Sequence, residues 1–550
     1  MKKMKILATF LVAILLITAM PTSIVQAETT TSASLIVSND PASSGLSIKD
    51  KTYNLYEIFS ATTVVSSDDG EDDNIEYTLN TVYYGFFNEI LSSSYDETDD
   101  GTFTHEATAY IDGLETTEEL QAFVTSLRDY IVDEENSITF DYSTSKYYIS
   151  SDVEYVTAEG VELGYYLVLD TDALSDTGTT VTVTNGSLAN IPGRAGDGSV
   201  TADVTISLKG SQPTLEKEIY HNDLDDWDDV ADYSIGDTVE FLITATIPSD
   251  VSAYTDYTYT ITDNLSEGLT YDSGSLKVYT SSTLDENSEV KTYYSLHTNS
   301  SDYTFRLDFE MMNIKKDFPS GEVMYIYYTA TVTEDAAIYG DGYEQNTAKL
   351  EYSNNPYDST STGTVDDTVY GYTFALDVIK TAGDGTTPLS GAKFALYEVT
   401  TSDAGEKRTQ IYLASNGADG DVDVYYVSNG DTSSGGGVII TSSYGTFTIE
   451  GLDDAKNYVL VETEAPERYN AAAEISFTIS ATYEKDSSSG VMIPTVTATN
   501  VGNGLSITVI NTSASLLPST GGIGTTIVMM GGGSLMLLAC VLLVFKKKRA

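Results

Sequence analysis

The sequence predicts a mainly β protein of tandem immunoglobulin-like β-sandwich domains in an elongated rod, with a first domain of mixed α and β structure. Short alternating runs rich in Tyr, Thr, Val and Ser are separated by Gly, Asn and Asp, which is typical of β-sandwiches. Clear examples of such strands are residues 239–247, 257–263 and 323–332. The linkers between the predicted domains are short, which favours a rod whose domains move little relative to one another.

One segment of the first domain is predicted to be helical. Its apolar residues recur at helical spacing: Leu120, Phe123, Leu127 and Ile131. Thr116 and Glu119 form a capping box ahead of this run, which predicts where the helix begins. Residues 84–91 are a second candidate helix.

The two ends of the 550-residue chain carry targeting signals. Residues 1–27 are expected to be a cleaved secretory signal peptide, because a basic start and an apolar run precede the small residues around Ala27. The alternative, an uncleaved anchor, requires a longer apolar run. Residues 523–545 are almost uncharged and long enough to span a bilayer, and residues 546–549 after them are all basic. The bulk of the chain is therefore expected outside the cell.

Three domains are expected between these ends, with joins near residues 210–213 and 370–371. The domains are 28–210, which mixes α and β structure, and 211–371 and 372–514, which are all β. Residues 515–550 form a sorting tail.

The composition limits which partners the exported part can bind and which covalent cross-links can stabilise it. The chain holds 83 acidic and 27 basic residues, and this excess of negative charge disfavours nucleic acid as a partner. The only cysteine, Cys540, lies in the predicted membrane span. The exported part therefore cannot form an internal disulfide, and another kind of stabilising cross-link is expected.

Signals for catalysis or metal binding are weak. No phosphate loop or nucleophile elbow is present, and His105, His221 and His297 are scattered without metal-ligand spacing. The acidic runs 68–73 and 223–229 are dense in carboxylates, but they do not fit the EF-hand loop and are interpreted as solvated turns; the alternative is that they bind calcium. The sequence predicts no enzyme, no cofactor and no metal site.

The segment Leu517-Pro518-Ser519-Thr520-Gly521 stands just before the predicted span. With the span, the basic stop and the signal peptide in order, it resembles the LPxTG cell-wall sorting signal; the alternative is a chance match in an ordinary membrane-anchored protein. The resemblance implies that a sortase attacks the Thr520 carbonyl and releases everything from Gly521 onward. The acyl group then passes to peptidoglycan precursor, or to a lysine of another copy.

Strand alternation predicts which lysine faces solvent. In residues 202–208 one face is apolar and the other polar, so Lys209 belongs to the outward face. Its position resembles the pilin-motif lysine of backbone pilins, although that family usually shows Tyr-Pro-Lys where this chain has Ser207-Leu208-Lys209. The alternative is an ordinary surface lysine.

Two other lysines are predicted to face the core. Lys217 shares a strand face with Leu215 and Ile219, and Lys380 shares one with Leu376 and Val378. A lysine on a core face is costly unless it is neutral, paired or chemically reacted. The two positions call for a common explanation.

Each of these domains also places an asparagine and an acid on a core face. The asparagines are Asn346 and Asn511, and the acids are Asp263 and Glu462. Such a trio can form an intramolecular isopeptide bond, because burial favours a neutral amine and a protonated acid. The acid polarises the amide and shuttles protons as ammonia leaves. The alternative is that the lysines snorkel or pair with the acids.

The family resemblance then becomes specific. Residues 458–469 look like the E-box, YxLxETxAPxGY, of collagen-adhesin B-type domains, with Arg468 in place of its Gly, and residues 261–271 are similar to the isopeptide-forming middle domain of backbone pilins. The resemblance implies the cross-links Lys217–Asn346, helped by Asp263, and Lys380–Asn511, helped by Glu462. In the first domain, Lys51 and Asn185 are a candidate pair without a well-placed acid.

The sequence is therefore identified as a sortase-assembled, Gram-positive backbone pilin, joined through Thr520 to Lys209 of the next subunit. Its expected partners are sortase, other copies of itself, accessory pilins, peptidoglycan and host surface ligands. Its expected location is a cell-surface pilus. The alternative is a monomeric wall-anchored adhesin that uses the sandwiches as a stalk.

Overall fold

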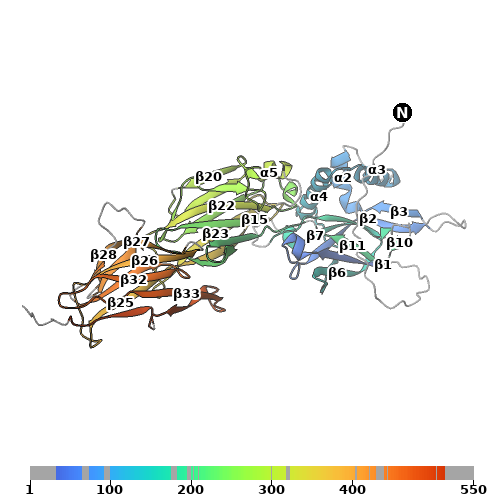
Figure 1. Ribbon diagram of the computed structural model, residues 1–550. Coiled ribbons are helices and arrows are strands. Elements are labelled where there is room, and N and C mark those ends of the chain that lie inside the picture. The colour runs from blue at the N-terminus through green and yellow to red at the C-terminus, as the bar shows by residue number, and fades with distance from the viewer. Residues whose placement is uncertain are drawn as a thin grey trace, which may run out of the picture. The chain divides into compact units, whose positions relative to one another are not determined.

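The computed structural model describes residues 32–514, apart from 65–73, 92–99, 175–181, 195–199, 318–322, 429–438 and several gaps of one or two residues. These residues form two compact units (Figure 1): the first ends at Gly210 and the second begins at Ser211, with Thr182 belonging to the second. The predicted signal peptide, membrane span and sorting motif lie outside the described residues. None of the helices in the described part has the length and apolar character needed to cross a membrane.

The first unit combines sheets and helices. Its longer strands are β1 (Ser32–Asn39), β2 (Tyr53–Val64), β3 (Asn74–Leu79), β5 (Lys146–Ser150), β6 (Val153–Glu162), β7 (Gly164–Asp170), β8 (Ser187–Ile191) and β11 (Asp203–Ser207), and the two-residue strands are β4 (Tyr142–Ser143), β9 (Gly193–Arg194) and β10 (Val200–Thr201). One sheet has the order β11-β1-β6-β5 and another the order β3-β2-β7-β8, with β4 paired to β2.

The helices of this unit are α1 (Pro41–Ser44), α2 (Tyr84–Leu91), α3 (Asp100–Asp112) and α4 (Thr117–Val132). Figure 1 shows α2, α3 and α4 grouped on one side of the unit. The predicted capping box is present, since Thr116 and Glu119 each accept a backbone N–H of the other, and α2 has the predicted bounds. Phe123 and Leu127 of α4 are buried against Phe86 and Phe87 of α2. The mixed α and β character of this region is confirmed.

The second unit opens with a sandwich of two sheets. The first sheet holds β12 (Leu215–His221), β13 (Asp226–Asp228), β15 (Thr238–Thr246), β17 (Leu269–Tyr271), β18 (Lys277–Tyr279), β19 (Glu289–Val290) and β22 (Val323–Val332). The second holds β14 (Val230–Asp232), β16 (Tyr259–Leu265), β20 (Tyr294–Thr298), β21 (Phe305–Phe309), β23 (Glu344–Ser353) and β24 (Thr362–Tyr372). Their orders are β13-β12-β15-β22-β18-β19, with β17 on β22, and β14-β24-β23-β16-β21-β20. A short helix, α5 (Met311–Asp317), follows β21.

A second sandwich completes the unit. Its first sheet holds β25 (Phe374–Ala382), β28 (Leu413–Asp419), β29 (Val422–Val427), β31 (Thr446–Leu452) and β35 (Ser506–Asn511). The other holds β26 (Lys393–Ser402), β27 (Gly405–Ile411), β30 (Ile439–Ile440), β32 (Asn457–Glu464), β33 (Ile475–Lys485) and β34 (Met492–Thr499). The first strand β25 and the last strand β35 run parallel side by side. The predicted mainly β class is confirmed.

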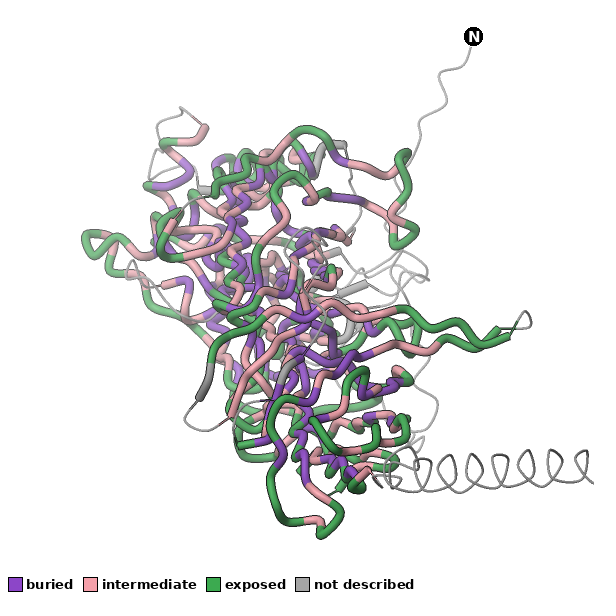
Figure 2. The backbone as a smooth tube through the Cα atoms, turned by 60° about the vertical axis from the view of Figure 1, so that its left-hand side comes forward, coloured by how far each residue is buried: buried purple, intermediate pink, exposed green. Residues whose placement is uncertain are grey.

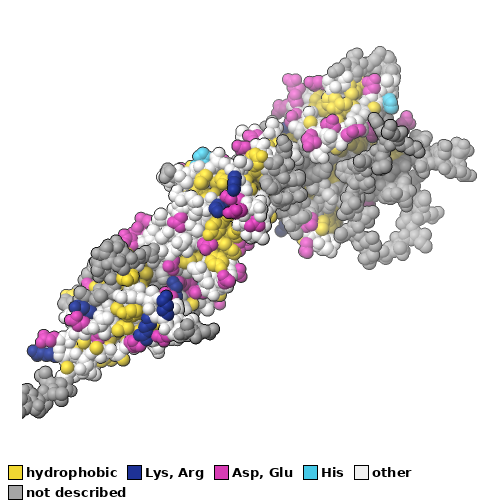
Figure 3. All heavy atoms as spheres, turned by 45° about the horizontal axis from the view of Figure 1, so that its top comes forward, with side chains coloured by type: hydrophobic (Ala, Val, Ile, Leu, Met, Phe, Trp, Pro, Cys, Tyr) yellow, Lys and Arg dark blue, Asp and Glu magenta, His cyan; other side chains and the backbone are white. Residues whose placement is uncertain are grey.

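Burial follows strand alternation through this unit. In β22, for example, Met324, Ile326, Tyr328 and Ala330 are buried while the residues between them are only half-buried. One hydrophobic cluster extends from Leu215 of the first sandwich to Val509 of the second, so the two sandwiches share a continuous core. Figure 2 shows the buried backbone running through the interior, with exposed residues at the loop tips. On the face in Figure 3, Asp and Glu side chains are scattered over the surface.

The alternation predicted near the end of the first domain is present in its described residues. Asp203, Thr205 and Ser207 are exposed, while Val204 and Ile206 are half-buried. Ala202 and Lys209 themselves lie outside the described residues, so the outward direction of Lys209 stays a prediction.

Candidate cross-linking sites

The first sandwich of the second unit brings Lys217, Asp263 and Asn346 to its core. Lys217 lies on the inward face of β12, where the exposure of successive residues alternates. Asp263 and Asn346 come from the opposite sheet. Asp263 pairs with Ala348 and Leu265 pairs with Asn346, so Asp263 and Asn346 are diagonal neighbours on the same face of β16 and β23.

The three side chains meet around the hydroxyl group of Tyr328. Lys217 Nζ lies 2.6 Å from Asp263 Oδ2 and donates a hydrogen bond of 2.7 Å to the Tyr328 hydroxyl. The Asn346 side-chain amide donates to the same hydroxyl at 2.5 Å. Lys217 and Asp263 have no exposed surface, and Asn346 is 1% exposed. An amine, a carboxyl group and a carboxamide thus lie together in the core, out of contact with the solvent-accessible surface.

The surroundings of this cluster weaken the charged forms of its members. Burial lowers the pKa of Lys217, against the opposing pull of the Asp263 carboxylate. Burial raises the pKa of Asp263, against the opposing pull of the lysine. A neutral amine beside a protonated acid is the combination that attack on an amide requires.

Tyr328 is a member of this cluster that sequence reasoning missed. It shares the buried face of β22 with Met324 and Ile326, so alternation assigns it to the core but does not show that its hydroxyl meets Lys217 and Asn346. Through its hydrogen bonds to Lys217 and Asn346, the hydroxyl holds the amine and the amide in place. It therefore acts as a positioning group.

Replacing Tyr328 with phenylalanine is expected to slow bond formation between Lys217 and Asn346, because both lose a partner that fixes their geometry. Each polar group left unpaired also costs about 1–3 kcal/mol of folding free energy. Intact mass against time after synthesis measures the reaction. The matched control is Tyr271→Phe. The ring of Tyr271 packs on Tyr328, but its hydroxyl makes no hydrogen bond to the cluster. Equal rates in both variants would contradict the positioning role.

The second sandwich contains a related cluster of Lys380, Glu462 and Asn511. In the parallel pair β25–β35, Lys380 is opposite Val509 and Ala382 is opposite Asn511, so Lys380 and Asn511 are diagonal neighbours on the buried face. Glu462 reaches them from β32 in the facing sheet. Lys380 and Asn511 have no exposed surface.

Glu462 lies between the two groups that the proposed bond would join. Its Oε1 accepts a hydrogen bond of 2.9 Å from the Asn511 amide and lies 3.9 Å from Lys380 Nζ. Its Oε2 accepts the backbone N–H of Ala472 at 2.6 Å, which fixes the orientation of the carboxyl group. Lys380 Nζ donates to the backbone carbonyl of Val509 at 3.1 Å. Burial lowers the pKa of Lys380, which favours its neutral form.

The first unit differs from this pattern. Lys51 Nζ lies 2.6 Å from Asp170 Oδ2 and 3.1 Å from Asp172 Oδ2. Asp170 is a buried acid at the end of β7 that sequence reasoning did not identify, and burial raises its pKa. Asn185 is buried and accepts a hydrogen bond from Gln121, while its neighbour Thr184 donates its backbone N–H to Asp170. A link between Lys51 and Asn185 stays a prediction.

Two models of protein families match segments of this chain. A model of the SpaA prealbumin-like fold domain matches residues 374–489, and a model of the LPXTG cell wall anchor motif matches residues 510–550. No curated protein matches the chain. The second match confirms the predicted LPxTG sorting signal and the predicted location of the protein at the cell wall.

Two solved structures illustrate what the fold is similar to. One is a backbone pilin of Streptococcus pyogenes, at 17% sequence identity, with 88% of this chain and 99% of that chain covered and a TM-score of 0.47. The other is the full-length major pilin SpaD from Corynebacterium diphtheriae, at 18% identity, with 88% and 97% covered and a TM-score of 0.45.

Proposed function

We propose that this cell-wall-anchored chain, with its SpaA prealbumin-like domain and its LPXTG motif, is the backbone subunit of a covalent pilus stabilised by internal isopeptide bonds. One observation carries the proposal: two sandwiches in succession each bury a lysine beside an acid and an asparagine. Buried ionisable groups of this kind are costly in an ordinary domain. A reaction that turns amine and amide into a neutral cross-link removes that cost.

The proposed reaction in the first sandwich joins Lys217 to Asn346. The neutral Lys217 amine attacks Cγ of Asn346 while the protonated Asp263 donates its proton to the amide oxygen. A new bond forms between Nζ and Cγ, and the bond from Cγ to Nδ2 breaks. Asp263 takes a proton from Nζ and passes it to the leaving nitrogen, which departs as ammonia. As the carbonyl re-forms, the amide oxygen returns its proton to Asp263. The acid therefore ends in its starting protonation state, and the product is a secondary amide.

Glu462 takes the same role for Lys380 and Asn511 in the second sandwich. Each reaction occurs once per chain, so the protein modifies itself without acting on other substrates. Each bond closes a loop of about 130 residues, which by the loop-entropy estimate stabilises the fold by about 5 kcal/mol. Such bonds cannot be reduced, which suits an exported chain without cysteine.

Polymerisation is proposed to use the sorting motif and Lys209. A sortase thiol forms an acyl bond to Thr520 as the bond to Gly521 breaks, and the Lys209 amine of another copy then displaces the thiol. The last copy is passed to peptidoglycan instead. Accessory pilins and host surface ligands are further expected partners of the fibre.

Replacing Lys209 with alanine is expected to abolish the ladder of high-mass species on denaturing gels of cell-wall extracts, because the acceptor amine is lost. Anchoring of single subunits to the wall should persist, since the LPXTG motif is intact. The control is Lys349→Ala, which removes an exposed lysine of β23 and should leave the ladder unchanged. An unchanged ladder in the Lys209 variant would contradict this acceptor. The absence of any ladder in the native strain would favour the monomeric adhesin.

A further inference from the structure

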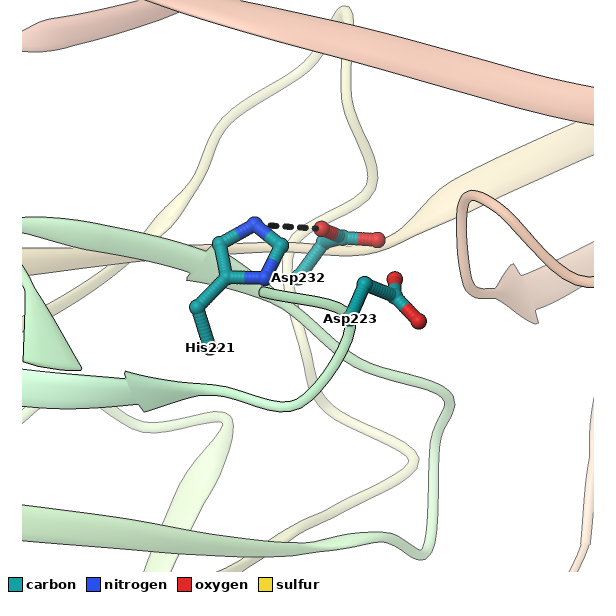
Figure 4. A group of neighbouring side chains, drawn as sticks. All are labelled: His221, Asp223 and Asp232. Atoms are coloured by element: carbon teal, nitrogen blue, oxygen red, sulfur yellow. Dashed lines mark ion pairs between the residues drawn. The ribbon is translucent and has the colours of Figure 1, made fainter. Parts of the chain in front are cut away.

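Several acidic side chains meet where the two sandwiches of the second unit join. Figure 4 shows three groups from the first sandwich: His221 at the end of β12, Asp223 in the turn that follows it, and Asp232 at the end of β14. The second sandwich adds Asp453 and Asp454, which directly follow β31. The cluster is separate from both lysine sites and uses none of their residues.

The four carboxylates of the cluster lie close together. One oxygen from each of Asp223, Asp232, Asp453 and Asp454 lies within 4.8 Å of the others. Asp232, Asp453 and Asp454 are 3%, 4% and 5% exposed, and Asp223 is exposed to solvent. Like charges so close together repel one another strongly away from water.

Positive charge near the cluster is limited. Lys456 Nζ lies 2.5 Å from Asp453 Oδ2, and its other acidic contact, at 3.4 Å, is Asp237. His221 Nε2 lies 3.6 Å from Asp232 Oδ1, and it carries charge only when protonated. Among the described residues, Lys456 is therefore the one lysine in an ion pair with the three buried carboxylates, and of these three it pairs only with Asp453.

Hydrogen bonds hold the carboxylates in place but leave one buried oxygen without a partner. Asp232 accepts the Tyr483 hydroxyl at 3.0 Å on one oxygen and the Asp454 backbone N–H at 2.7 Å on the other. Asp454 Oδ2 accepts the Ala481 backbone N–H at 2.6 Å. Asp453 Oδ1 is buried and has no hydrogen-bond partner among the described residues. A buried carboxylate oxygen in that state is costly unless a cation meets it.

We propose that these four aspartates bind a calcium ion at the junction of the two sandwiches. Calcium takes oxygen ligands at about 2.3–2.6 Å, so ligands on opposite sides of the ion lie up to about 5 Å apart, which agrees with the spacing of the cluster. Carboxylates without sulfur or several imidazoles favour this hard cation over zinc. Exposed Asp223 leaves a side open, through which water completes the coordination.

Such an ion would tie the two sandwiches together. Asp232 belongs to the first sandwich, and Asp453 and Asp454 to the second. The junction already contains a close approach, since the Ile235 N–H donates to the carbonyl of Gly451 at 3.2 Å. A calcium ion adds a load-bearing contact beside it and stiffens the joint.

The test uses calorimetry on the mature chain released from the cell wall. Titration with calcium chloride should give a dissociation constant of about 10⁻⁴–10⁻³ M, the range of extracellular calcium modules. The melting temperature should rise by about 3–10 °C in 10 mM calcium relative to EDTA. Magnesium at the same concentration should have a smaller effect, because it demands a more rigid octahedral site.

Two variants locate the site. Asp223→Asn removes an exposed ligand without disturbing buried contacts, and it should weaken calcium binding about tenfold or more. Asp226→Asn neutralises another exposed aspartate of the same acidic run and should bind as the native chain does. The absence of a calcium response, a response to zinc alone, or equal binding by both variants would overturn the proposal.

Discussion

Replacing Asp263 with alanine is expected to prevent the Lys217–Asn346 bond and to destabilise the first sandwich of the second unit severely. The measured mass should then lack the deficit of one ammonia, about 17 Da, that this bond causes relative to the mass calculated from the sequence. The acid is the closest partner of Lys217, at 2.6 Å, and in its absence the amine is buried without a carboxyl group. An unreacted amine that stays buried without its acid partner costs about 3–5 kcal/mol. The missing cross-link removes about 5 kcal/mol more. Together these losses approach the whole stability of an ordinary domain.

Intact-mass spectrometry and urea unfolding measure the two effects separately. Asn264→Ala is the matched control, because Asn264 follows on the same strand and its side chain is exposed. It should keep the native mass deficit, relative to the mass calculated from its own sequence, and the native unfolding midpoint. If the Asp263 variant still lacks the ammonia, the acid is not needed for the reaction. If native chains show no mass deficit, the proposed bonds do not exist.

Replacing Glu462 with alanine is expected to make the second sandwich extensible under force. With Lys380 joined to Asn511, tension that enters at β25 passes through the cross-link to the adjacent strand β35. Without the bond, the roughly 130 residues between them can unfold and add about 450 Å of contour length. Single-molecule pulling on the mature chain measures this step directly.

Glu464→Ala is the control for this experiment. Glu464 lies two residues further along β32 and makes an exposed ion pair with Lys393 at 2.6 Å, which contributes less than about 1 kcal/mol. Chains with this change should resist extension as native chains do. An extension step of the same length in native chains would show that Lys380 and Asn511 remain unlinked.

The inward lysines could be predicted from the sequence because strand alternation is a local property. Leu215, Lys217 and Ile219 are buried while Glu216 is exposed, as the period of two requires. The same rule holds for Lys380, with Val378 buried on the same face and Ile379 exposed on the other. Alternation does not say which strands will face each other. The meeting of Lys217 with Asp263 and Asn346 was therefore inferred from the family resemblance.

Tyr328, Asp170 and the acidic cluster show what local patterns leave out. The local pattern predicts only that Tyr328 is an aromatic residue of the core and that Asp170 ends an apolar strand. Their contacts with the lysines become visible only when the strands are packed in the structure. The sequence predicts a solvated turn at Asp223, because its neighbours in the fold, Asp453 and Asp454, are distant in sequence. The sequence analysis does not predict helix α3, in which the buried hydrophobic residues of the described part are Phe103 and Ala107.

The closed loop of the second sandwich has a further consequence for the survival of the fibre. Any loop between Lys380 and Asn511 lies within a covalent ring once the proposed bond has formed. A host protease that cuts one such loop opens the ring but does not separate the pieces, because the chain on either side of the cut stays joined through the amide. A subunit nicked once at this place would still hold its neighbours, and the bacterium would stay attached.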